Sequence, residues 1–107
     1  MKKYDVFLMP NAIEDLEGIY TYIAEQSGLP ERAWAYIERL KEACLKLETS
    51  PARGQKRDDL MAGLRIYPLD KNCIAAFLVD ETAQVVRILD IFYGGQDYDA
   101  IMTSMPR

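Results

Sequence analysis

The first half of the chain shows apolar residues at helical spacing. Five of them follow Pro10 at intervals of one, three or four positions: Ile13, Leu16, Ile19, Tyr20 and Ile23. This periodicity predicts an amphipathic helix. Pro10 suits the first turn, because its missing N–H is not needed there, and Ser27-Gly28 provides a stop signal. We therefore predict a helix from Pro10 to Ser27.

A second helix is predicted directly afterwards. Pro30 suits its first turn, and its apolar stripe consists of Ala33, Ile37, Leu40, Cys44 and Leu47. Thr49-Ser50-Pro51 ends the pattern. Because the link between the two helices is short, we expect an antiparallel helical hairpin.

The second half of the chain reads as strands separated by short turns. Leu64 to Pro68 begins the series, with Pro68 limiting that strand to an edge or to its end. Cys73 to Val79 is nearly all apolar, as expected for a strand buried on both faces, and Val85 to Tyr93 is the strongest strand pattern. Three consecutive strands with short turns predict an antiparallel meander.

Three further segments complete the predicted order. Val6 to Leu8 reads as a first strand, Arg53 to Gly63 as a polar loop, and Asp97 to Met102 as a short terminal helix. The order β-α-α-β-β-β predicts an α+β, two-layer domain in which the helical hairpin covers one face of the sheet. A length of 107 residues suits one domain over 1–107.

The composition narrows the possible chemistry. The chain has no histidine, which removes the usual zinc sites and the Ser-His-Asp and Cys-His catalytic groups. Cys44 and Cys73 lie in apolar patterns, so we expect buried thiols. We expect no metal and no cofactor. No apolar run approaches a membrane span and no signal peptide is apparent, so we expect a cytoplasmic protein without a membrane partner.

The charge is acidic overall but unevenly distributed. A formal net charge of -4 opposes non-specific nucleic-acid binding, which depends on a basic field. The cations concentrate between Arg32 and Arg65, however, whereas the chain beyond Val79 is mainly acidic. One basic face therefore stays possible.

Several local runs, in this order, resemble the RelE/ParE toxin superfamily over nearly the whole chain, and most closely its ParE-like branch. The runs are Pro10-Asn11-Ala12 with Glu14-Asp15-Leu16, Ile19-Tyr20 through Ala24, Leu47 through Pro51 with Gly54, Gly63-Leu64-Arg65 with Pro68, Val86-Arg87-Ile88-Leu89, and Tyr93-Gly94-Gly95-Gln96-Asp97-Tyr98. The resemblance implies a small curved antiparallel sheet beside a helical hairpin. It also implies a toxin of a type II toxin–antitoxin (plasmid stabilisation) module, held inactive by a cognate ParD/RelB-like antitoxin.

The resemblance leaves two toxic activities open, because ParE-like members poison DNA gyrase and RelE-like members cut mRNA in the ribosomal A site. RNA cleavage without histidine would need cations and a phenol, for which the candidates are Arg65, Lys56, Arg57 and Tyr93. The family often has arginine after the last strand, where this chain has Gly95 and Gln96. We therefore place gyrase first and a metal-independent, ribosome-dependent endoribonuclease second, and we expect that the chain is not an enzyme. A toxin homologue that only binds its antitoxin is the third hypothesis.

The candidate surface residues come from these runs and from the second predicted helix. For the toxic surface they are Arg65, Arg87, Tyr93, Gln96 and Tyr98, and for antitoxin binding Trp34 and Tyr36, which flank the stripe of the second helix. Each has a structural alternative. Arg65 could pair with Asp90 or another strand acid, Arg87 could be a solvated sheet residue, and Trp34 and Tyr36 could pack within the hairpin.

Overall fold

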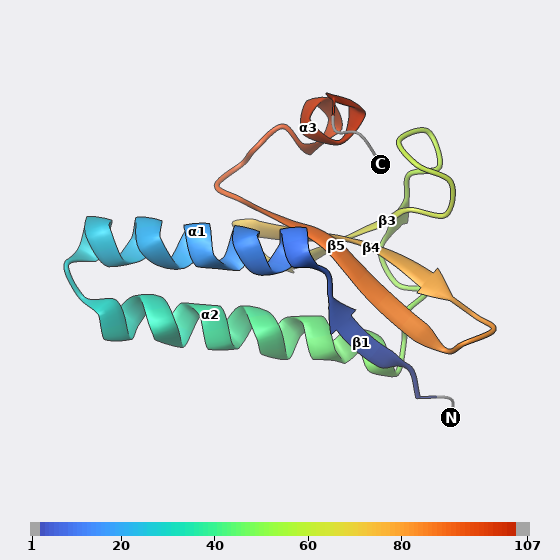
Figure 1. Ribbon diagram of the computed structural model, residues 1–107, viewed down its shortest axis with the longest axis horizontal. Helices are drawn as coiled ribbons and strands as arrows, with labels where there is room; N and C mark the ends of the chain where they lie inside the picture. Colours follow the sequence, from blue (N-terminus) through green and yellow to red (C-terminus); the bar gives the residue numbers. More distant parts are fainter. Residues whose placement is uncertain (1–2, 105–107) are drawn as a thin grey trace.

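The computed structural model describes residues 3–104 and confirms the α+β class (Figure 1). The elements in chain order are β1 (Asp5–Leu8), α1 (Pro10–Ser27), α2 (Pro30–Leu45), the 3₁₀ turn η1 (Lys46–Glu48), β2 (Gln55–Lys56), β3 (Arg65–Asp70), β4 (Cys73–Asp80), β5 (Val85–Tyr93) and α3 (Tyr98–Ser104). No helix in this part of the chain is long and apolar enough to cross a membrane.

The helical hairpin forms as the proline and glycine positions predict. Each helix has proline in its first turn, and α1 ends at Gly28, whose φ of 69° is left-handed. The Gly28 N–H donates to the Ala24 carbonyl oxygen at 2.9 Å, which satisfies a carbonyl at the end of the helix. Figure 1 shows α1 and α2 lying side by side.

The strands of residues 3–104 form one sheet in the order β1-β5-β4-β3-β2. The predicted antiparallel meander of β3, β4 and β5 is confirmed. The first strand pairs with the last one in parallel, from Asp5 opposite Val85 to Leu8 opposite Ile88. A parallel pair needs a long crossover connection between its strands, and the helical hairpin is the first part of that connection. β1 therefore lies at one edge of the sheet.

The prediction of a loop from Arg53 to Gly63 was wrong in one part. Gln55 and Lys56 form the short strand β2, opposite Ile66 and Arg65 of β3. Pairing at a sheet edge uses the main chain, so two exposed polar residues can form it without any apolar pattern. Gly54 permits this approach, because its φ is 92° and a Cβ there would lie 2.5 Å from the Ile66 carbonyl oxygen.

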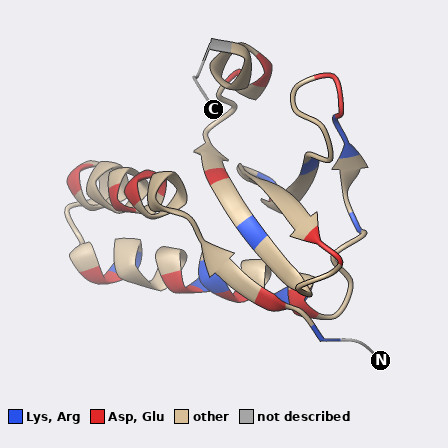
Figure 2. Ribbon diagram, turned by 45° about the vertical axis from the view of Figure 1, so that its right-hand side comes forward, with Lys and Arg blue, Asp and Glu red and all other residues tan. Residues whose placement is uncertain are grey.

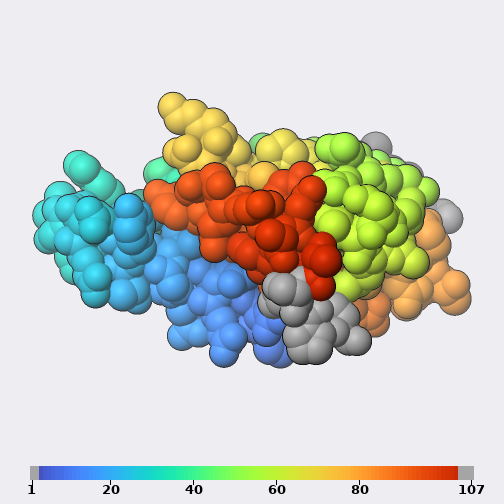
Figure 3. Space-filling model, turned by 90° about the horizontal axis from the view of Figure 1, so that it is seen from above, coloured from blue at the N-terminus to red at the C-terminus, as the bar shows by residue number. Residues whose placement is uncertain are grey.

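The helical hairpin covers one face of the sheet, as predicted. The opposite face is covered as well, which the two-layer prediction did not include. The main core lies between the hairpin and the sheet and includes Leu16, Leu40 and Phe77. A smaller core on the other side joins Leu64 and Phe92 of the sheet region to α3 and the loop before β3. Figure 3 shows the red α3 segment next to the blue α1 and to the yellow-green loop before β3. The predicted C-terminal helix thus closes the second face.

Candidate functional site

An apolar groove with a volume of about 550 Å³ lies between the two long helices, beside the end of β1. Its wall on α1 includes Ile13, Leu16 and Tyr20, and its wall on α2 includes Trp34, Ile37 and Lys41; Leu8 closes the end at β1. Trp34 is 55% exposed and Ile13 is 47% exposed. Exposed apolar residues that line one groove make it a candidate surface for a partner.

Trp34 is held in position at the rim of this groove. Its ring meets Tyr20 edge to face, with centroids 6.5 Å apart, and the Lys41 Nζ lies 5.6 Å from the Trp34 centroid. A large, partly fixed aromatic ring loses little freedom when a partner covers it. The structure therefore brings Trp34, one of the two candidates for antitoxin binding, into a site.

Tyr36, the other candidate, lies on a different flank of α2 and packs within the protein. Its hydroxyl donates to Asp70 Oδ2 at 2.8 Å, and its ring contacts Tyr93 with centroids 5.8 Å apart. Burial, followed by this hydrogen bond, raises the pKa of Tyr36 well above its usual value. Tyr36 thus joins α2 to the ends of β3 and β5.

A second cavity, of about 430 Å³, lies between α1 and the end of β5. Tyr22 and Tyr93 form its aromatic wall, with ring centroids 6.0 Å apart, and Glu14 and Asp15 supply carboxylates from α1. The Ile91 N–H donates to Asp15 Oδ2 at 2.8 Å, which fixes α1 against β5. Sequence reasoning missed this cavity, because Glu14, Asp15 and Tyr22 were noted only within runs that resemble the family and were assigned to no site.

The segment from Tyr93 to Tyr98 turns the chain from β5 into α3. Gly94 and Gly95 have φ values of 74° and 77°, which glycine adopts without strain. Gln96 Oε1 accepts a hydrogen bond from the Tyr93 N–H at 3.0 Å. The glycines and Gln96 therefore build a turn, which gives these positions a structural role.

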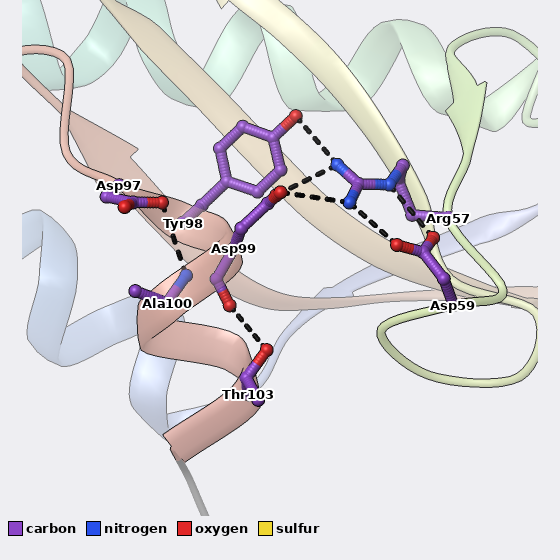
Figure 4. Close-up of polar contacts among 7 residues, drawn as sticks. All are labelled: Arg57, Asp59, Asp97, Tyr98, Asp99, Ala100 and Thr103. Carbon is purple, nitrogen blue, oxygen red and sulfur yellow. Dashed lines mark hydrogen bonds and ion pairs between the residues drawn. The ribbon is translucent and has the colours of Figure 1, made fainter.

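Arg57 is the centre of a polar network that holds α3 to the loop before β3 (Figure 4). Its guanidinium donates to both carboxylate oxygens of Asp99 at 2.9 and 3.1 Å, and to those of Asp59 at 3.0 and 2.8 Å. Tyr98 lies under it, with its hydroxyl 3.2 Å from Arg57 Nη1. The bonds to Asp59 and Asp99 raise the pKa of Arg57, and Arg57 lowers the pKa of Asp59. The cation is thus neutralised within the protein.

The four candidate nuclease residues do not converge. Lys56 and Arg65 are directly opposite one another on β2 and β3, while Arg57 extends toward α3 on the other face. Arg65 Nη1 donates to the Ala52 carbonyl oxygen at 2.8 Å. Tyr93 is opposite Cys73, which lies four residues along β4 from Phe77, the residue opposite Arg65. At about 3.3 Å per residue, that offset alone is roughly 13 Å.

The other candidate surface residues also have partners in the protein. Arg87 lies between Val86 and Ile88 of the main core, so its side chain is on the other face of the sheet, and its Nη1 lies 3.7 Å from Asp80 Oδ2. Tyr98 packs its ring against Phe92 with centroids 6.1 Å apart. Within residues 3–104 there is no group of three or more acidic or cysteine side chains placed to hold a metal ion.

Comparison with solved structures defines the class of fold. A chain of the chromosomal ParDE TA system from P. aeruginosa superimposes with a TM-score of 0.72 at 24% identity, covering 85% of this chain and 96% of that one. A chain of the toxin–antitoxin complex RelBE2 from Mycobacterium tuberculosis gives a TM-score of 0.64 at 20% identity, covering 90% and 97%. At these identities the likeness is one of fold, and it is a fold found in toxin–antitoxin complexes.

The family follows from the sequence match. The model for the ParE toxin of the type II toxin–antitoxin system, parDE, matches residues 6–98, which is most of the chain. The chain therefore belongs to the ParE toxin family. The comparison with curated proteins gave no match.

Proposed function

We propose that this chain is the toxin of a type II toxin–antitoxin pair, that a cognate antitoxin neutralises it, and that it acts on DNA gyrase. Membership of the ParE family over residues 6–98 supports the first two parts. The observation that carries the choice of target is the separation of Lys56 and Arg65 from Arg57 and from Tyr93.

Cleavage of RNA requires a base, an acid and a cation around one phosphate, within hydrogen-bond reach of the reacting atoms. Arg57 is bound by two carboxylates, and Tyr93 lies on the far part of β5 among tyrosines rather than cations. The turn after β5 presents Gly95 and Gln96 where RelE-like enzymes often have arginine. This arrangement favours inhibition by binding over catalysis.

The groove between α1 and α2 is the surface that we assign to the antitoxin. Its apolar walls and exposed Trp34 suit the apolar side of an amphipathic segment. The edge strand β1 ends beside it at Leu8 and is paired on one side by β5. Trp34 is the expected anchor, whereas Tyr36 acts by holding the hairpin to the sheet.

The proposal is tested by inducing the chain in growing cells and assaying the purified protein on two targets. We expect arrested growth, relieved by the antitoxin, together with loss of gyrase supercoiling and intact mRNA in translating ribosomes. New A-site ends in ribosome toe-printing, abolished by Arg65→Ala, would identify a nuclease and refute the gyrase target. Unchanged growth with retained antitoxin binding would show an inactive homologue and refute both toxic activities.

A further inference from the structure

The cavity of about 430 Å³ between α1 and the end of β5 combines carboxylates with tyrosine rings, and we call it the α1–β5 cavity. Glu14, Gly18 and Tyr22 are four residues apart, so they form one row along α1. At about 1.5 Å per residue, this row is roughly 12 Å long. Tyr93 contacts the Tyr22 ring from the end of β5. None of the described residues that line the cavity is lysine or arginine.

Gly18 leaves a gap in the middle of this row. Glycine inside a helix makes the helix less stable than alanine would. A close approach by another segment often explains such a glycine, yet a Cβ at Gly18 would meet nothing of the described chain within 4 Å. Contacts within residues 3–104 thus give no reason for glycine here. The missing side chain leaves room between the Glu14 carboxylate and the Tyr22 ring, which are one turn away on either side.

Arg57 shows how this chain holds a guanidinium elsewhere. The group lies 5.6 Å from the centroid of the Tyr98 ring and donates to two carboxylates. The α1–β5 cavity offers the same kinds of group, namely tyrosine rings and two carboxylates. The cations that lie over aromatic rings within residues 3–104 are on other rings than Tyr22 and Tyr93. The chemistry of the cavity therefore suits a guanidinium that another molecule supplies.

The charge of α1 favours a cation at this cavity. The helix carries four acids and neither lysine nor arginine, and Figure 2 shows it marked in red without blue. Glu14 is exposed, and no salt bridge found in residues 3–104 involves it. Asp15 is half-buried, and its Oδ2 accepts the Ile91 N–H at 2.8 Å, which fixes this carboxylate in the wall. A guanidinium in the cavity would meet carboxylate oxygens and aromatic rings together.

We propose that the α1–β5 cavity binds an arginine side chain of a protein partner. A guanidinium stacks on tyrosine and bonds a carboxylate through two N–H groups, whereas the lysine ammonium is a more strongly hydrated point charge. Arginine is also enriched at protein interfaces and among their anchor residues. The inference goes beyond the proposed function, because the cavity lies on the flank of α1 opposite to the apolar groove and requires no toxic activity.

The test is an NMR titration of the ¹⁵N-labelled full chain with a blocked Gly-Arg-Gly peptide. We expect saturable shifts of the amides of Gly18, Tyr22 and Gly94, which line the cavity. The citrulline peptide, which has a similar shape without the charge, should cause no such shifts, and the lysine peptide should bind several-fold more weakly. Equal binding of the lysine peptide would overturn the proposal, because it would show only the general attraction of a cation to an acidic protein. Unchanged amides at the cavity would overturn it as well.

Three variants separate the cavity from the overall charge of the helix. Glu14→Gln should weaken binding of the arginine peptide roughly three- to fivefold. Glu25→Gln is the matched control, since Glu25 is another exposed acid of α1 but does not line the cavity, and it should bind like the parent. Gly18→Leu keeps every charge but fills the gap, so binding should be lost. Circular dichroism should show all three folded. Equal weakening in the two glutamate variants, or parent-like binding by folded Gly18→Leu, would overturn the proposal.

Discussion

Arg57 and Asp99 are 42 positions apart in the sequence, yet both oxygens of the carboxylate accept hydrogen bonds from the guanidinium, at 2.9 and 3.1 Å. This pair fastens α3 to the loop before β3 above the smaller core. A short helix has little stability of its own, so its position depends on such contacts. The contact therefore helps the apolar contacts of Tyr98 and Met102 to hold α3 over the second face of the sheet.

Removing this pair should loosen α3 selectively. In Asp99→Asn, amide hydrogen exchange in Tyr98–Ser104 should be several-fold faster than in the parent, because the charge-assisted bonds to Arg57 are lost. Exchange in α1 should not change, since α1 belongs to the main core. Arg87→Gln is the control, because it breaks a salt bridge to Asp80 that involves neither α3 nor Arg57. Unaltered exchange in α3 of Asp99→Asn would contradict this role.

Replacement of Trp34 should weaken binding of the proposed cognate antitoxin. Trp34→Ala removes the exposed ring at the rim of the groove, and anchors of this type contribute about 2 kcal/mol or more, or roughly 30-fold in affinity. Leu29→Ala is the matched control, since Leu29 is also an exposed apolar residue but does not line the groove. Titration calorimetry distinguishes the two variants, and equal affinities would exclude the groove as the binding surface.

The local elements could be predicted from the sequence, because their signals are local. Prolines and Gly28 fix the helix ends, and the apolar runs of β4 and β5 coincide with the observed strands. The parallel pairing of β1 with β5 could not be predicted in this way, since it joins segments about 80 positions apart and leaves no periodic pattern. The same reason hid β2, whose pairing depends on main-chain groups and on Gly54.

The candidate site could also be predicted only in part, because its contacts join residues far apart in the sequence. Trp34 stood out as an aromatic beside an apolar stripe, but its partners across the groove, Ile13 and Leu8, had been assigned to ordinary helix and strand patterns. Arg57 was chosen for its charge, and only the fold reveals that Asp99 neutralises it. Residue type thus indicates which chemistry is available, whereas three-dimensional contacts decide which groups remain free to use it.

Two glycines should respond in opposite directions to alanine. Gly54→Ala should lower the free energy of unfolding by about 1–3 kcal/mol, because φ is 92° and the new Cβ would meet the Ile66 carbonyl oxygen at 2.5 Å. Gly18→Ala should raise it by about 0.5–1 kcal/mol, since Gly18 lies within α1 and its Cβ would meet nothing within 4 Å. Urea unfolding measures both, and a stable Gly54→Ala would show that the β2 approach is not tight.

Tyr36 should make the fold less stable at alkaline pH. Burial and the hydrogen bond to Asp70 raise its pKa in the folded protein, whereas the unfolded chain releases the proton near the ordinary value of 10.0. The contribution of the neutral phenol is therefore fully present below pH 10, and it is lost as the pH rises above that value, because only the unfolded state then ionises.

The comparison of the parent with Tyr36→Phe isolates this effect. Tyr4, whose pKa is raised by its hydrogen bond to Glu81, is present in both proteins and cancels in the difference. Urea unfolding from pH 7 to about pH 11 should show the stability difference shifting in favour of Tyr36→Phe as the pH passes 10. A difference that stays constant over this range would mean that Tyr36 ionises as readily in the folded protein as in the unfolded chain. In that case the contact with Asp70 would not hold α2 to β3 through a neutral phenol.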